Sequence, residues 1–331
     1  MATPAAHTLA FYEPGHFHAA MTLKSPNPRV RPRVHLYAAP GADRDAFLAL
    51  VASFNSREEQ PTAWEVEVHG DGSAASQLEA LVADGLATIV VLAGKNDRKM
   101  ETIARLTSAG INVLADKPWC THAASLPHLV AATAAGHAGT ALAMDIMTNK
   151  HDVYAQLRRA IVLDPSLFGG WSSDESKPQI ELGALHHLAK VVNGAPLRRP
   201  PWYYDVRVQG NGLVDVHSHL VDQVQWLVSP NGGTWAFDDD VRILSAKAWD
   251  TAVDLPLYRD STGLEAFEPD IAPLVVDSVL PLRANGAIEY ELRGVRVRQQ
   301  ADWFQREPPN SGDAHTAILR GELCDITMAQ V

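Results

Sequence analysis

The feature that most restricts the fold of this chain is a regular alternation, from residue 7 to about 145, of short apolar runs with longer amphipathic stretches. Such alternation is typical of a parallel sheet whose strands are joined by helical crossovers. The clearest run is ATIVVLA at residues 87–93, which is unbroken and β-branched, as in a central strand covered on both faces. We therefore predict a doubly wound, Rossmann-like α/β domain over residues 1–147.

The same pattern predicts the other elements of this domain. Five further strands are expected, at residues 7–12, 34–38, 65–69, 111–115 and 141–147. Helices are expected at residues 15–24, 43–54, 76–84, 97–110 and 123–135.

Beyond about residue 150 the texture changes, because Pro, Trp and charged residues become more frequent. We predict an α+β domain over residues 148–331, for substrate binding and oligomerisation, with a mixed, mostly antiparallel open sheet. Alternating strands are expected at residues 203–208 and 295–300, and amphipathic helices at 181–192 and 216–228 are expected to cover one face. The chain ends after an apolar alternation at 318–328 without a clear terminating signal, which suggests a truncated second domain.

Composition excludes several classes of protein. Hydrophobic residues make up 46% of the chain and charged residues 20%, which is enough apolar material for a globular core. The net charge of -11, without a stripe of Lys and Arg, argues against nucleic-acid binding. No apolar run approaches the ~20 residues that cross a bilayer, and residues 1–8 lack the features of a signal peptide. With only two cysteines, Cys120 and Cys324, we expect a cytoplasmic protein without disulfides.

The turn after the first expected strand carries a partial dinucleotide motif. A dinucleotide site needs a tight strand-to-helix turn and a glycine where the backbone meets the pyrophosphate. Of the pattern G-x-G-x-x-G only the middle glycine remains, as Gly15, while Glu13 and His18 occupy the outer positions. An ordinary strand–turn–helix is the alternative. The end of the second strand, residues 37–41 (YAAPG), has neither the acidic residue typical of NAD sites nor the Arg typical of NADP sites, so either cofactor fits.

Two further segments carry chemistry. Lys117 follows the strand at 111–115, at the edge where open α/β sheets bind ligands, and an amine there suits proton transfer. Asp215, His219 and Asp222 are spaced i, i+4 and i+7, so on a helix beginning near 215 they would share one face. The alternatives are a surface lysine and a capping Asp with a structural His.

These residues resemble the Gfo/Idh/MocA oxidoreductase family, whose members carry E-K-P after the fifth strand and later G-G-G-x-x-x-D-x-G-x-H-x-x-D. Here the first motif is Asp116-Lys117-Pro118, and the second is GNGLVDVHSHLVD at residues 210–222. The resemblance spans roughly residues 7–230, and GHFHAA with WYYDV is most similar to a subgroup described only as oxidoreductases, whose members continue past the end of this chain. Asp116 in place of Glu, His217 in place of Gly and the lost outer glycines are departures that bear on cofactor affinity.

The resemblance implies roles for individual residues. Lys117 would contact the reacting oxygen, His219 would donate or accept a proton, and Asp215 would position the substrate, with all three meeting between the two domains. The dinucleotide would lie against the following residues, with a cis peptide before Pro118: Gly15, His16, Phe17, His18, Ala93, Gly94, Asn96, Asp116 and Pro118.

Candidate substrate contacts come from both domains. They are Asp145, His186, Trp202, Tyr204 and Asp222. Tyr203 joins Trp202 and Tyr204 as a candidate stacking wall for a sugar ring, with packing in the core as the alternative. His187 and Lys190 lie beside His186 on the expected helix at 181–192, with a solvated helix face as the alternative.

The leading hypothesis is an NAD(P)-dependent oxidoreductase that transfers a hydride between nicotinamide and a hydroxyl-bearing carbon of a sugar or cyclitol-like substrate. It requires no metal ion, and exposed sheet surface in the second domain would be covered in a homo-oligomer, a dimer or tetramer. Three alternatives remain: an NAD-dependent glycoside-cleaving enzyme that uses transient oxidation, a non-catalytic dinucleotide-binding sensor, and a metal-dependent hydrolase. The last follows from the similarity of Asp215, His217 and His219 to the D-x-H-x-H strand motif of amidohydrolases.

Overall fold

A computed structural model describes residues 7–70, 72–147, 149–192, 194–229, 237–309 and 311–330 of the chain. The chain divides into two compact units, Met1–Ile146 and Met147–Val331, and each is described by itself. Within the described residues no helix has the length and apolar character needed to span a membrane.

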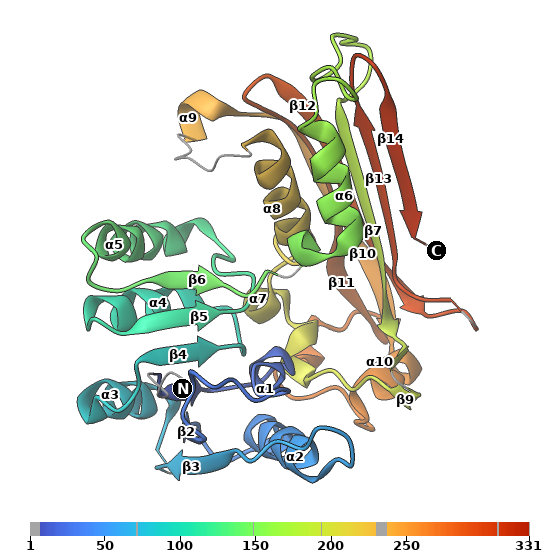
Figure 1. The fold of residues 1–331 in the computed structure, drawn as a ribbon. Helices are drawn as coiled ribbons and strands as arrows, with labels where there is room; N and C mark the ends of the chain where they lie inside the picture. Colours follow the sequence, from blue (N-terminus) through green and yellow to red (C-terminus); the bar gives the residue numbers. More distant parts are fainter. Residues whose placement is uncertain are drawn as a thin grey trace. The chain divides into compact units, whose positions relative to one another are not determined.

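The first unit is built on a six-stranded parallel sheet in the order β3-β2-β1-β4-β5-β6 (Figure 1). Its strands are β1 (Leu9–Tyr12), β2 (Arg33–Tyr37), β3 (Glu65–His69), β4 (Ile89–Leu92), β5 (Asn112–Ala115) and β6 (Ala143–Asp145). The strand order reverses between β1 and β4, and such a switch point is where doubly wound sheets bind their ligands. The predicted Rossmann-like fold is confirmed.

The helices of this unit are α1 (His18–Met21), α2 (Ala42–Ser56), α3 (Ala74–Asp84), α4 (Lys99–Ser108) and α5 (Leu126–His137), with a 3-10 turn η1 (Ala123–Ser125). Adjacent strand residues point to opposite faces of the sheet, so Val91 packs in one apolar cluster with Phe11 and Phe47, while Val90 packs in another with Ile103. Two covered faces explain why the central strands are uniformly apolar.

The second unit is built on a six-stranded mixed sheet in the order β10-β11-β12-β7-β13-β14, in which only the β12–β7 pair is parallel (Figure 1). Its strands are β7 (Ile180–Ala189), β10 (Val241–Asp254), β11 (Val279–Leu292), β12 (Val295–Arg306), β13 (Ala314–Arg320) and β14 (Asp325–Gln330). A short hairpin is formed by β8 (Val191–Val192) and β9 (Ala195–Pro196). The expected mixed, mostly antiparallel sheet is confirmed.

The other elements of this unit are the helices α6 (Val153–Val162), α7 (Val206–Gln209), α8 (His217–Val228), α9 (Phe237–Asp240) and α10 (Leu255–Thr262) and the 3-10 turns η2 (Asn149–His151), η3 (Pro201–Tyr204) and η4 (Ala272–Leu274). Leu220, Val224 and Leu227 of α8 pack in the core of this unit with residues of the sheet. The expected helix at 216–228 and the strand at 295–300 are therefore present, as α8 and within β12.

Two sequence predictions in this unit are wrong. Residues 181–192 contain no helix: residues 181–189 belong to β7 and residues 191–192 form β8. Ile180, Leu182 and Ala184 of β7 alternate inward, and β7 is hydrogen-bonded between β12 and β13. Residues 203–208 are not a strand but the end of η3 and the start of α7, where the Asp205 carboxylate accepts a hydrogen bond from the Arg207 amide and caps the helix.

Candidate functional site

Loops at one edge of the first sheet carry the predicted cofactor residues. Parallel strands end at the same edge of a sheet, so the loops after β1, β4 and β5 are neighbours there. The amides of Gly15 and His16 donate to the carbonyl of Ala93, at 3.0 and 2.9 Å, and the Asp116 amide donates to Leu92 at 2.7 Å. These bonds join the three loops. The helix expected at 15–24 is limited to α1, because the amides of Thr22, Leu23 and Lys24 donate to carbonyls three residues earlier, as in turns.

Gly94 allows the loops after β1 and β4 to approach each other closely. A Cβ atom at Gly94 would lie 2.2 Å from the carbonyl oxygen of Glu13 and 3.2 Å from the amide of Gly15. No side chain fits such a space, so the glycine is required by the close approach.

Glu13 occupies the position of a lost glycine in the motif, and the structure shows two features of this residue. Its backbone has φ of 43°, the left-handed region that favours glycine, so the turn keeps the conformation of the motif. Its Oε1 accepts a hydrogen bond from the Ala39 amide at 2.9 Å, just after β2, and burial raises the pKa of this carboxyl against the opposing effect of that bond. A carboxyl group therefore stands at the end of β2 although β2 itself supplies none.

Asp116 lies between two histidines. Its Oδ2 is 3.1 Å from the Nδ1 of His16 and 3.1 Å from the Nδ1 of His18, while its Oδ1 accepts a hydrogen bond from the Lys117 amide at 2.9 Å. Burial favours a higher pKa for the Asp116 carboxyl, but the two imidazoles hold its pKa well below the usual value. Burial lowers the pKa of His16 despite the neighbouring carboxylate, and the charges of His18 and Lys117 lower it further.

A buried lysine that the sequence analysis missed supports the same loop. Lys99 is only 4% exposed, and its Nζ donates to the Asp116 carbonyl at 3.1 Å and to the Asn96 side chain. The signal in the sequence was a lysine on the apolar face of α4, beside Met100 and Ile103. Asn96, predicted as a cofactor contact, is thus linked through Lys99 to the carbonyl group of Asp116.

The peptide bond between Lys117 and Pro118 is cis, as the family resemblance implied. Lys117 is half-buried directly after β5, and Asp145 ends the neighbouring strand β6. Phe17, predicted to border the dinucleotide, is exposed and lies beside His16 and His18.

In the second unit, the segment before α8 is held against the sheet by a second glycine. The Gly212 amide donates to Arg283 of β11, and a Cβ at Gly212 would lie 2.3 Å from the backbone carbon of Asn285. Asp215 follows in the turn before α8 and is 5% exposed. Because α8 begins at His217, Asp215 precedes the helix on which the sequence analysis placed it with His219 and Asp222.

The carboxylate of Asp215 accepts a hydrogen bond from a tyrosine of the same unit. The hydroxyl of Tyr203 donates to Asp215 Oδ2 at 3.3 Å, and burial together with the Asp215 charge raises the pKa of Tyr203 well above its usual value. Tyr203 therefore keeps its proton at neutral pH and remains a donor. Sequence reasoning counted Tyr203 only as a candidate stacking residue, because its partner lies 12 residues later.

The ring of Tyr203 is part of a row of aromatic and charged groups. The guanidinium of Arg199 lies 4.6 Å from the Tyr203 ring and 5.0 Å from the Trp303 ring, and Trp303 stacks on His186. His186 Nδ1 is 2.8 Å from an oxygen of Asp313. Burial favours a raised pKa for Asp313, but His186 and Lys190 hold its pKa below the usual value.

The predicted substrate residues have different environments. Tyr204 is fully buried, and its hydroxyl donates to Ser261 in the core of the second unit. His186 lies on β7, and not on a helix, with its side chain toward Asp313. Trp202 lies in η3. Asp222 of α8 forms an ion pair with Lys150, with 3.0 Å between Nζ and Oδ1.

The structural context required by the metal-dependent hydrolase is absent. Residues 212–216 are a turn and His217–Val228 a helix, whereas the D-x-H-x-H motif belongs to a strand. His217 is 1% exposed, its Nδ1 is 2.7 Å from the carbonyl of Gly212, and burial lowers its pKa. His217 therefore packs the turn before α8 onto the sheet.

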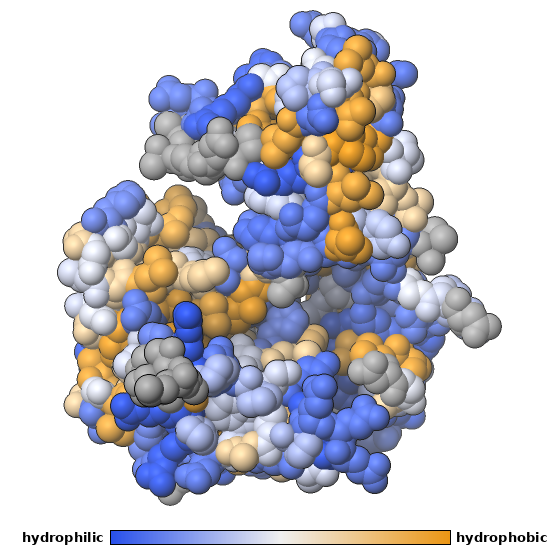
Figure 2. All heavy atoms as spheres, in the orientation of Figure 1, coloured by the Kyte–Doolittle hydropathy of each residue, from blue (hydrophilic) through white to orange (hydrophobic). Residues whose placement is uncertain are grey.

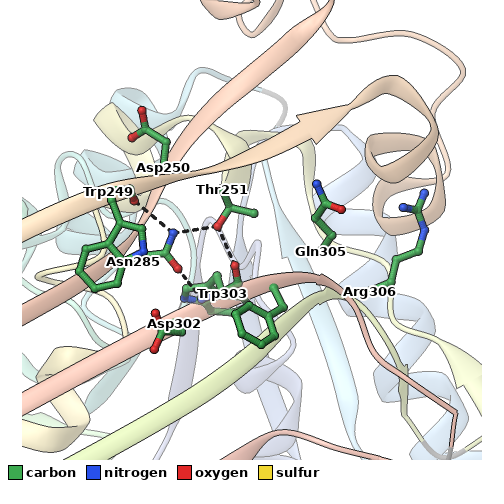
Figure 3. Close-up of a pocket in the computed structure, with 9 residues that line it drawn as sticks. Trp249, Asp250, Thr251, Asn285, Asp302, Trp303, Gln305 and Arg306 are labelled. Carbon is green, nitrogen blue, oxygen red and sulfur yellow. Dashed lines mark hydrogen bonds between the residues drawn. The ribbon is translucent and has the colours of Figure 1, made fainter.

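Two cavities lie within the second unit. One, of about 510 Å³, is lined by residues of β10, β11 and β12; in Figure 3 the Asn285 amide bridges Trp249 and Thr251 at its wall. The other, of about 770 Å³, is lined by Arg158, Gln223 and His315 among other residues. Neither cavity is lined by Asp215 or His219.

Comparison with known proteins assigns the family. Residues 33–142 match the model described as "Oxidoreductase family, NAD-binding Rossmann fold", the Gfo/Idh/MocA model. Residues 157–331, more than half of the chain, match the model described as "Putative oxidoreductase C terminal domain". The chain belongs to the Gfo/Idh/MocA oxidoreductase family. Its first unit is thus an NAD-binding Rossmann domain. No curated protein sequence matches the chain.

Several solved structures are similar to this chain. A putative oxidoreductase from Parabacteroides merdae is 33% identical, with a TM-score of 0.94, over 100% of this chain and 74% of that one. GenD2 from gentamicin A biosynthesis, solved with NAD, has a TM-score of 0.63 at 14% identity, over 99% of this chain and 73% of its own. The WlbA dehydrogenase from Bordetella pertussis, solved with NADH and UDP-GlcNAcA, has a TM-score of 0.58 at 16% identity, over 99% of this chain and 75% of its own.

The residues present fit the family's cofactor. The close approach at Gly94 and the left-handed backbone of Glu13 keep the turn of the Gfo/Idh/MocA loop without its outer glycines. The switch point between β1 and β4 adjoins this turn. Gly15, Phe17, Gly94, Asp116 and Pro118 are the residues of this edge that would hold the dinucleotide.

Proposed function

We propose that this chain is an NAD-dependent oxidoreductase that acts on a hydroxyl-bearing carbon of a sugar or cyclitol-like substrate. The main support is Lys117, which follows β5 at the edge of the sheet where the family binds its dinucleotide. The sugar class is extended from the relative solved with UDP-GlcNAcA and from the enzyme of gentamicin A biosynthesis.

The bound nicotinamide would supply the hydride chemistry. The protein's own groups would manage the proton: Lys117 would hold the substrate oxygen, and His219 would donate or accept the hydroxyl proton. Asp215, oriented by the Tyr203 hydroxyl, would position the substrate. Lys117 belongs to the first unit and Asp215 and His219 to the second, so their convergence on one substrate remains a prediction.

Addition of NAD is expected to stabilise the chain against heat. A ligand that binds only the folded state adds about 2.7 kcal/mol at a concentration 100-fold above its dissociation constant. The measurement is the melting temperature with NAD, with NADP and with neither. If both dinucleotides leave the melting temperature unchanged at millimolar concentrations, the proposal is wrong.

NAD is expected to bind more tightly than NADP because of Glu13. Domains that prefer NAD carry a carboxylate at the end of the second strand, and Glu13 supplies one there through its bond to Ala39. In Glu13→Gln the ratio of the two affinities should move toward NADP about 10-fold, or about 1.4 kcal/mol. The matched control is Glu59→Gln on the exposed surface, which should leave the ratio unchanged. An unchanged ratio in Glu13→Gln would rule out this source of specificity.

We also propose that the chain forms a homo-oligomer through its second unit. Apolar side chains are exposed on α6 (Val153, Leu157) and on the sheet (Ile243, Leu244, Phe304), and Figure 2 shows apolar surface, in orange, over α6. Both outer strands, β10 and β14, have an unpaired edge. Light scattering after gel filtration should give a mass of two or four chains, and a mass of one chain would contradict the proposal.

A further inference from the structure

We propose that His16, His18 and Asp116 form a binding site for a divalent transition-metal ion of the Zn²⁺ type. No metal ion is expected from the sequence, in which these three residues are candidate dinucleotide contacts. The inference goes beyond the proposed oxidoreductase function, because it requires no dinucleotide and concerns the first unit alone.

The donor atoms have the separations that one ion requires. Oδ2 of Asp116 is 3.1 Å from Nδ1 of His16 and 3.1 Å from Nδ1 of His18, and the three residues each offer a ligand atom within 4.8 Å of the others. Two donors that are each about 2.1 Å from one metal ion lie about 3.0–3.4 Å apart in octahedral or tetrahedral geometry. The two distances from Asp116 to the histidines fall within this range, and the two histidine ligand atoms lie within 4.8 Å of each other.

Hydrogen bonding does not account for this cluster. The Nδ1 atoms of His16 and His18 are both buried, and neither has a hydrogen-bond partner. Their 3.1 Å distances to Asp116 are short enough for a hydrogen bond, so it is the direction that is unsuitable. Buried polar atoms without partners are uncommon and call for an explanation, of which an absent ion is one. The two imidazole nitrogens thus lie at ion-pair distance from one carboxylate oxygen without hydrogen-bond geometry, an arrangement that a shared metal ion would satisfy.

The surrounding backbone holds the three groups in position. The His16 amide donates to Ala93, and the two imidazole rings are in edge contact with centroids 4.3 Å apart. Asp116 is held through its amide by Leu92 and through Oδ1 by the Lys117 amide, which leaves Oδ2 facing the histidines. Lys99 contacts the Asp116 carbonyl. A preorganised ligand set binds an ion at a smaller entropic cost.

The ligand set determines the class of ion. Imidazole nitrogens favour zinc and neighbouring transition metals over Mg²⁺ and Ca²⁺, which prefer all-oxygen sites. Three protein ligands leave at least one coordination position open, as in catalytic and not in structural zinc sites. The side chains of His16 and His18 are 24% and 32% exposed, so the two rings border solvent although their Nδ1 atoms are covered.

A second group of similar composition serves as the comparison. His35, Glu67 and His69 also offer ligand atoms close to one another. There, however, His35 Nδ1 and His69 Nε2 are 2.9 Å apart in a hydrogen bond, and the His69 ring stacks on Tyr37. This second group is satisfied without an ion, so it provides a matched control.

The test uses the full chain, freed of any purification tag and treated with a chelator. Zn²⁺ is titrated by calorimetry, and Co²⁺ by its visible absorption, both without dinucleotide. The wild-type chain should bind one equivalent. His16→Gln, His18→Gln and Asp116→Asn should each weaken binding at least about 100-fold, more than is lost when an outer-shell partner of a metal ligand is removed. His69→Gln should leave affinity and stoichiometry unchanged.

Circular dichroism of each variant shows whether it is folded, and with two histidine variants the test survives the loss of one. The proposal is overturned if the wild-type chain binds no Zn²⁺ or Co²⁺, or if folded His16→Gln and His18→Gln bind as the wild type does. It is also overturned if His69→Gln alone removes binding, since the ion would then belong to the second group. Because no dinucleotide is present, a failure here is distinct from a failure to bind NAD.

Discussion

A Lys117→Met variant is expected to lose about 1000-fold in kcat, within the range attributed to a positioned proton-transfer group. Methionine keeps the length of the side chain but has no proton to exchange and no charge to place beside the substrate oxygen. Binding of NAD should change little, because Lys117 would act on the substrate and the dinucleotide would be held by the loops around Gly15 and Gly94. The measurement is the formation of reduced nicotinamide with a panel of sugars and cyclitols.

The matched control for this variant is Lys24→Met, since Lys24 is an exposed lysine of the same unit. It should retain the wild-type kcat. Equal activity of Lys117→Met and the wild type would remove Lys117 from the mechanism.

Wild-type behaviour in the same assay separates the remaining alternatives. Cleavage of a glycoside without accumulation of reduced nicotinamide would indicate transient oxidation. Binding of NAD without turnover of any substrate would favour a dinucleotide sensor.

Much of the first unit could be predicted from sequence because its strands are short and buried on both faces. The strand expected at 65–69 is β3, and the run at 87–93 contains β4. Propensity and periodicity act locally there, in the direction of the final fold. The helix predicted at 15–24 is longer than α1, because the amides of Thr22, Leu23 and Lys24 form turns to carbonyls three residues earlier and do not continue the helix.

In the second unit the same reasoning failed at β7. The apolar residues of 180–192 fit a helical face about as well as an alternating strand, and β7 is selected by its pairing with β12 and β13, more than 100 residues later. Pairing partners at such separation leave no trace in a local pattern. The predicted helix was wrong for this reason: His186 lies on strand β7, and Lys190 directly follows that strand.

The site shows the same division. Lys117 and Asp116 could be predicted because a motif marks them, whereas Glu13, Lys99 and Tyr203 depend on contacts with residues distant in sequence. Glu13 reaches Ala39, and Lys99 reaches Asp116. The sequence shows that these three residues are polar, but it does not show which distant residue each of them contacts.

The largest expected effect on stability comes from a single added methyl group at Gly94. Gly94→Ala should destabilise the first unit by about 3 kcal/mol, the upper part of the range for overpacking, and should weaken NAD binding. The new Cβ would lie 2.2 Å from the Glu13 carbonyl oxygen, which is backbone and cannot rotate away. Glu13 is fixed by its amide to Tyr37 and by its carboxylate to Ala39, so relief of the clash would break one of these bonds. Urea unfolding and NAD titration measure the two effects.

Gly136→Ala is the control that isolates space from glycine chemistry. Gly136 lies in helix α5 of the same unit, and the nearest atom to a Cβ there is the Ala141 carbonyl oxygen at 3.9 Å, which is ordinary contact. Because alanine restricts the unfolded chain and favours a helix, this variant should gain about 0.5–1 kcal/mol. If Gly94→Ala lowers the free energy of unfolding and Gly136→Ala raises it, the loops after β1 and β4 can approach each other only because residue 94 has no side chain. If Gly94→Ala unfolds at the same urea concentration as the wild type, the loops are free to separate and the close approach is not what builds this edge of the sheet.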